Sequence, residues 1–244
     1  MSFISSVIFF IVVSVILFTM QLSQSVFAIF YHFALAKKSS KAPHRLADNF
    51  SLFYIFGNEL FYTSMWLFTY FILYALFYSV ENLTHNIFFW VLAGILIAEA
   101  ILFFIIYFRR AVGRKFVKQN STALFIPRTF AHNLTSRAQS VKTQKDAFLL
   151  GFFTAVPELI FTLPLFITAN LVILSTPTPT SFFIIFAIIA AALPLFAIRC
   201  FYRTGHTLAD YQRLHAKAKP FIRAIVPLLY LSLAAIIISW ELHA

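Results

Sequence analysis

Six apolar stretches, each long enough to cross a lipid bilayer, constrain this chain more than any other feature of its sequence. They are Phe3–Ala36, Ser51–Val80, Ile87–Phe108, Ala147–Leu174, Phe182–Ile198 and Phe221–Trp240. A helix rises about 1.5 Å per residue, so about 20 apolar residues cover the roughly 30 Å of hydrocarbon in a bilayer. Hydrophobic residues make up 61% of the 244 residues and charged residues only 11%, which is too little polar surface for a water-soluble globule. We therefore predict an all-α integral membrane protein with six transmembrane helices in one membrane domain, residues 1–244.

The positive charges predict how these helices are oriented. All 19 lysines and arginines lie in three segments, Lys37–Arg45, Arg109–Lys145 and Arg199–Arg223. Because short basic loops of membrane proteins stay in the cytoplasm, we expect a multi-pass protein with both termini outside, in the plasma membrane of a prokaryote. A basic rim beside anionic lipid accounts for the net charge of +11, so nucleic acid is not an expected partner. The predicted cytoplasmic loops are 37–50, 109–146 and 199–220.

Two kinds of self-similarity predict an internal repeat. The pattern His-x-Leu, followed by Ala or Thr and then Asp or Ser, occurs once in each basic segment. Its copies begin at His44, His132 and His206. Aligning residues 53–73 with residues 152–172 also places Glu59 on Glu158, and shared acids are unusual inside apolar helices. We predict three hairpins of like orientation, related by a pseudo-threefold repeat, over residues 1–80, 86–175 and 181–244.

Three acidic residues lie within the predicted spans: Glu59, Glu99 and Glu158. An ionised carboxylate at the centre of a bilayer costs about 2.5–3.5 kcal/mol or more, so it needs a proton, a cation, water or a charged partner. Thr63 follows the first of these acids by one helical turn, and Thr162 follows the third, which places each hydroxyl on the same face as a carboxyl group. We predict that these side chains bind a cation or a proton.

Other polar groups are expected to line the same interior. Asn58 precedes the first acid, and Gln21 and Gln24 lie on a polar stripe of the first apolar stretch. Pro157 and Pro164 flank the third acid, and each frees a backbone carbonyl one turn earlier. If these faces converge, they form a polar pocket open toward the cytoplasm. The alternative is that each acid is protonated and only bonds a neighbouring helix.

The His-x-Leu pattern also suggests a metal site. His44 and Asp48 are four residues apart, as are His206 and Asp210, so each pair shares one face if the segment is helical. Imidazole and carboxylate ligands suit a divalent transition metal, and His132 could complete a ring of three. The alternative is a set of interfacial elbow helices whose His and Asp face water. The sequence indicates no particular cofactor.

These features favour a transporter or channel for a small cation or solute, coupled to protons through the intramembrane Glu residues. A second hypothesis is a non-catalytic membrane subunit that docks a protein partner through its basic loops. A third, a membrane-embedded metal-dependent enzyme, lacks a recognisable nucleophile. The chain contains only five glycines, which predicts helices that approach loosely through Phe rather than closely through small residues.

Overall fold

All regular secondary structure in the described part of the chain is helical. The computed structural model describes residues 3–21, 29–30, 33, 43–79, 83–112, 137–175, 180–204 and 208–242. The helices are α1 (Phe3–Gln21), α3 (Pro43–Ser79), α4 (Leu83–Val112), α6 (Gln144–Thr154), the 3-10 turn η2 (Val156–Glu158), α7 (Leu159–Ser175), α8 (Thr180–Arg203) and α9 (Leu208–Leu242). The all-α fold predicted from the sequence is therefore confirmed for these residues.

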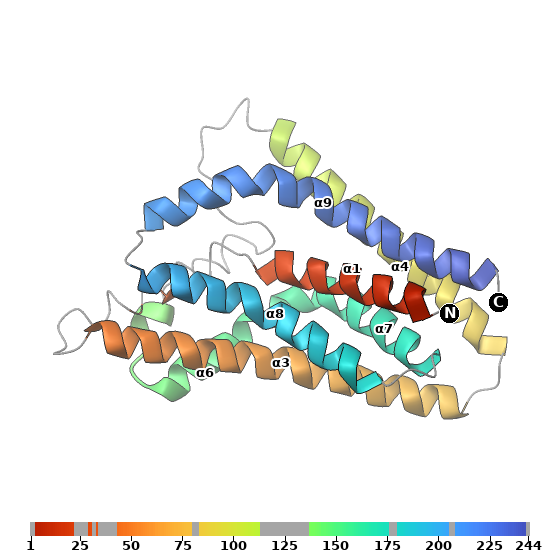
Figure 1. Cartoon of the computed structure of the whole chain (residues 1–244), viewed down its shortest axis with the longest axis horizontal. Helices are drawn as coiled ribbons and strands as arrows, with labels where there is room; N and C mark the ends of the chain where they lie inside the picture. Colours follow the sequence, from red (N-terminus) through yellow and green to blue (C-terminus); the bar gives the residue numbers. More distant parts are fainter. Residues whose placement is uncertain are drawn as a thin grey trace.

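The helices form an elongated bundle along one axis (Figure 1). α3 and α9 lie on opposite sides of it, with α1, α7 and α8 between them (Figure 1). Neighbouring helices form a closed circuit: α3 packs on α6 and α7, α7 on α4, α4 on α9, α9 on α1, α1 on α8, and α8 on α3. The start of α1 and the end of α9 lie at the same end of the bundle (Figure 1).

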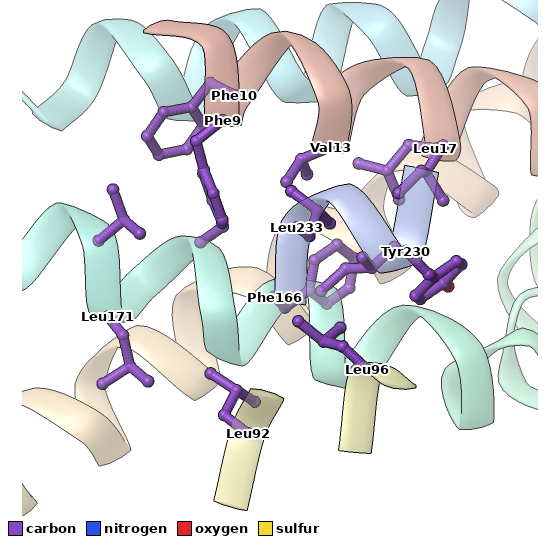
Figure 2. Close-up of a cluster of buried hydrophobic side chains, with 14 of the residues drawn as sticks. Phe9, Phe10, Val13, Leu17, Leu92, Leu96, Phe166, Leu171, Tyr230 and Leu233 are labelled. Atoms are coloured by element: carbon purple, nitrogen blue, oxygen red, sulfur yellow. The ribbon is translucent and has the colours of Figure 1, made fainter. Parts of the chain in front are cut away.

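Apolar side chains from α1, α3, α4, α7 and α9 form most of the larger core. Figure 2 shows Phe9, Phe10, Val13 and Leu17 of α1 together with Leu92, Leu96, Phe166, Leu171, Tyr230 and Leu233. A second cluster joins the first half of α3 to α6 and α8, around Phe50, Tyr54 and Leu195. Because lipid is as apolar as these side chains, contact between well-fitted surfaces holds such helices together.

Within the described residues, two helices are long and apolar enough to cross a membrane. These are Ile87–Ile105 within α4 and Ala224–Leu242 within α9. A third candidate is the pair α6 and α7, which pass the same test together but bend by 74° at the break between them. Large side chains such as Phe71 and Ile160 are more than 60% exposed, as expected of residues that face lipid. These properties are those of a membrane protein.

Several helices extend beyond the apolar stretches. α3 already begins at Pro43 and α9 at Leu208, so parts of the predicted loops 37–50 and 199–220 are helical. The added turns contain Ala, Leu and Lys, which favour helix, and a helix that leaves the bilayer keeps its backbone hydrogen bonds. α3 and α9 therefore continue into the segments that the hydropathy pattern assigned to loops.

The packing of the described helices does not follow a threefold rotation. Such a rotation would give equivalent neighbours to α1, α4 and α8, the first helices of the three predicted repeats. Instead α1 and α8 pack on each other, whereas α4 packs on α9. These contacts lend the repeat no support, and it stays a prediction from the sequence.

α3 and α6 cross with their backbones close together. A Cβ atom added to Gly57 would overlap the backbone carbonyl of Phe148, and one added to Gly151 would overlap the backbone carbonyl of Tyr54. Each glycine therefore admits the backbone of the other helix. The predicted loose approach is wrong at this crossing, because two of the five glycines lie where the backbones meet.

We expect Gly151→Ala to destabilise the protein by about 1–3 kcal/mol, the usual cost of forcing extra volume into a packed interface. The matched control is Gly94→Ala, since an added Cβ there meets no atom within 4 Å. This control should be neutral or gain up to about 1 kcal/mol from the better helix propensity of Ala. Thermal unfolding in detergent measures both, and equal midpoints for the two variants would contradict the close crossing.

Candidate functional site

The break between α6 and α7 places a polar point inside an apolar stretch. α6 ends at Thr154, and Pro157 has no N–H with which to continue the helical hydrogen bonds. The N–H of Glu158 instead bonds the carbonyl of Ala155 at 3.1 Å, which tightens the chain into the turn η2. In hydrocarbon the carbonyls freed at such a break need partners from neighbouring helices.

α3 supplies those partners from one face. Tyr54, Asn58 and Tyr62 recur every fourth residue, so their side chains lie above one another along the helix. The Tyr54 hydroxyl lies 2.8 Å from Oγ1 of Thr154, and Nδ2 of Asn58 donates to the carbonyl of Gly151 at 3.5 Å. These side chains partner the end of α6 where its own hydrogen bonds stop.

Glu158 is the acidic group at this break. The hydroxyl of Tyr62 donates to its Oε2, and Nε2 of Gln21, the last residue of α1, reaches the same oxygen at 3.4 Å. Thr162 donates to the backbone carbonyl of Glu158 at 3.1 Å and not to the carboxyl group. α1, α3 and the break between α6 and α7 therefore meet at one carboxyl group.

A second acidic residue lies near the same tyrosine. Both carboxyl oxygens of Glu59 are buried, as is Oδ1 of Asn58, and none of them has a hydrogen-bond partner among the described residues. The Tyr62 hydroxyl interacts electrostatically with Glu59 as well as with Glu158. Carboxyl, amide and hydroxyl oxygens are ligands for protons and for hard cations rather than for soft metals.

Other predicted site residues lie elsewhere or outside the described chain. Thr63 is half-buried on α3, and Gln24 lies outside the described residues. Glu99 is buried on α4, where it interacts electrostatically with Tyr230 of α9. The hydroxyl of Tyr230 donates to the backbone carbonyl of Phe161, in the first turn of α7, at 2.9 Å, so Tyr230 links Glu99 to the helix that follows the break.

The metal hypothesis falls largely outside the described chain. His132, His206 and the side chain of His44 lie outside it. Asp210 lies in the first turn of α9. The carboxylate of Asp48 is held by arginine. Within the described ranges no group of three or more His, Cys, Asp or Glu side chains is placed to hold a metal ion.

Asp48 belongs to an ionic cluster that ties the start of α3 to the end of α8. Its Oδ1 lies 2.9 Å from Nη2 of Arg199 and 3.6 Å from Nε of Arg203. Nε of Arg199 also donates to Ser51, one turn further along α3, at 3.2 Å. The side chains of Asp48 and Arg199 are only 24% and 14% exposed, so water screens this pair less than a surface pair.

We expect Asp48→Arg and Arg199→Asp each to lower the stability by about 1–3 kcal/mol, between the values for exposed and for fully buried pairs. The double variant restores the attraction with the charges exchanged and should recover part of the loss. Lys217→Ala, an exposed position on α9, serves as the control. Additive losses in the double variant would mean that the pair does not stabilise the fold.

Comparison with protein-family models, with curated proteins and with solved structures finds no match. Evidence about function therefore comes from the contacts of Glu158 at the helix break.

Proposed function

We propose that this protein is a membrane transporter or channel for a small cation, coupled to protons through Glu158. The observation that carries the proposal is a carboxyl group at the break of a bent, apolar helix pair, contacted by side chains from two other helices. Discontinuous helices in membrane proteins commonly mark the binding site of the transported ion, because the break leaves backbone groups and charges available there.

The donor set supports a proton or a hard cation as the ligand. Glu158 contributes a carboxylate, Tyr62 and Tyr54 contribute hydroxyls, and Asn58 keeps an unpartnered carbonyl oxygen among the described residues. A carboxylate in a low-dielectric interior favours whichever positive ion neutralises it. A proton and a cation then compete for the same oxygen atoms, and this competition couples their movements.

Further predicted groups take supporting roles in this proposal. Glu59 is the second carboxyl near Tyr62, and its unpartnered oxygens could accept the ion as it leaves Glu158. Thr162 holds the backbone of Glu158 in place. Thr63, Glu99 and Gln24 remain candidate lining groups.

The proposed topology has six spans in three like-oriented hairpins, with both termini outside. Two features support it. The helices run alternately in opposite directions along the bundle (Figure 1). The basic residues at the starts of α6 and α9 and at the end of α8 all belong to the segments assigned to the cytoplasm. Glu158 would then be reached from the cytoplasmic end, where Asp48 and Arg199 lie.

The experiment is ion flux in proteoliposomes that contain the purified full chain. An internal pH dye follows proton movement driven by imposed gradients of Na⁺, K⁺ or Li⁺, or by a membrane potential. We expect Glu158→Gln to lower the flux by about tenfold or more, the factor that follows from losing roughly 1.4 kcal/mol of interaction at a charged group. An amide cannot take up a proton or balance the charge of a cation.

Glu241→Gln is the matched control, since this acid lies in the last turn of α9 and has no contact with the break in the described structure. Its flux should equal that of the unmodified chain. Equal flux in Glu158→Gln and the unmodified chain would contradict the proposal and would favour a subunit that docks a partner through its basic loops.

A further inference from the structure

The polar face of α3 continues far beyond Glu158. Ser51, Tyr54, Asn58, Tyr62, Trp66 and Thr69 recur at intervals of three or four residues, and we call them the α3 stripe. From Ser51 to Thr69 the stripe is about 27 Å long at about 1.5 Å per residue, close to the thickness of the hydrocarbon core. Its partners are Arg199 at one end, then the α6–α7 break, then Asn170 near the end of α7.

Asn170 is fully buried, and its amide orientation is determined by its neighbours. Nδ2 lies 3.1 Å from the backbone carbonyl of Trp66 and 2.8 Å from Oγ1 of Thr69. A carbonyl oxygen can only accept a hydrogen bond, so the atom that faces Trp66 must be the amide nitrogen. Oδ1 of Asn170 therefore points away from both partners, and it has none among the described residues.

An unpartnered donor lies on the same stretch of α3. The indole Nε1 of Trp66 is buried, since the residue is only 2% exposed, and it also lacks a partner among the described residues. Buried amide oxygens and indole N–H groups are normally hydrogen-bonded, because leaving them unpaired is costly. Water both donates and accepts, so it can pair with either of these atoms, whereas a metal cation would be repelled by the indole N–H.

An aromatic stack separates this place from the Glu158 site. The ring of Phe166 lies 5.9 Å from the ring of Tyr62 on one side and 5.1 Å from that of Trp66 on the other, centroid to centroid. Tyr62 presents its hydroxyl to Glu158, while the ring of Trp66 contacts Phe166 one turn before Asn170, which bonds the backbone carbonyl of Trp66. The α3 stripe thus has two polar levels with a layer of rings between them.

We propose that Asn170, with Thr69 and the indole N–H of Trp66, forms a second binding site that holds water and passes protons between Glu158 and the far side. This inference rests on the proposed function. In the transfer, the O–H bond of the Glu158 carboxylic acid breaks and its proton joins a water molecule, leaving the carboxylate. Further water molecules pass the proton around Phe166 to the water held by Asn170, which donates a hydrogen bond to Oδ1 of Asn170 and releases one of its own protons toward the far side.

The first test is proton flux in the proteoliposome assay. Trp66→Phe removes the indole N–H but keeps a ring against Phe166, and Asn170→Leu removes the acceptor. Each should lower proton flux by about threefold to tenfold, the effect of losing one water-mediated hydrogen bond. The controls are Trp90→Phe, at an exposed Trp, and Thr168→Val, whose buried hydroxyl donates to the carbonyl of Pro164 in its own helix. Both controls should keep full flux.

The second test detects the water without any transport. The chain has three tryptophans, so a sample labelled with ¹⁵N-tryptophan gives three indole N–H signals by NMR. We expect the Trp66 signal, assigned with Trp66→Phe, to show magnetisation transfer from water in the unmodified chain and in Thr168→Val. The transfer should disappear in Asn170→Leu.

The outcomes separate this inference from the proposed function. Loss of flux in Glu158→Gln with full flux in Trp66→Phe and Asn170→Leu would overturn the second site and leave the first. If the Trp66 indole N–H of the unmodified chain shows no magnetisation transfer from water, the second site is overturned whatever the flux. Full flux in Glu158→Gln would overturn the proposed function, and with it the relay role of Asn170. Trp66→Phe keeps the hydrogen bonds of Asn170, so it remains informative if Asn170→Leu does not fold.

Discussion

The need to pair backbone groups inside hydrocarbon governs the arrangement around α6 and α7. A helix that spans a membrane meets this need by itself, but a helix that breaks cannot. Here the break at Pro157 is matched by a neighbouring helix that comes close enough to supply hydrogen bonds. Gly57 and Gly151 allow that approach, and Tyr54 and Asn58 then reach the end of α6. The close crossing and the polar face of α3 therefore act together to supply hydrogen bonds at the end of α6.

The same arrangement makes a buried acid tolerable. Glu158 follows the proline directly, and its carboxyl group receives hydrogen bonds from Tyr62 and from Gln21. A glutamate in the middle of an unbroken apolar helix would have had to find its partners without the hydroxyls already gathered at the break. Glu99 is closer to that case, since one of its buried oxygens has no partner among the described residues. This contrast is why Glu158 is the stronger candidate for chemistry.

The sequence predicted the helical class, and it singled out Glu158 and Pro157. Both the length of an apolar stretch and an acid within it can be read directly from the order of the residues. It did not predict Tyr54, Tyr62, Trp66 or Asn170. In a chain with 33 Phe, aromatic residues at helical spacing look like ordinary packing, and only the facing helix reveals which of them carry polar contacts. The spacing of Tyr54, Asn58 and Tyr62 was an available signal. The low glycine content led to the wrong prediction of loosely packed helices at the crossing of α3 and α6. The number of glycines does not indicate where in the fold they lie.

The two ends of the α3 stripe differ in charge. Asp48 and Arg199 lie at one end of the stripe, beside the basic segments, and Asn170 and Thr69 lie at the other, among uncharged residues. The charge of Asp48 offsets part of the positive charge of Arg199 and Arg203, and the same contacts link α3 to α8. At the opposite end no described charge stands beside Asn170. The two ends thus differ in chemistry, and the acid between them contacts Tyr62, which lies nearer to Thr69 than to Asp48 along α3.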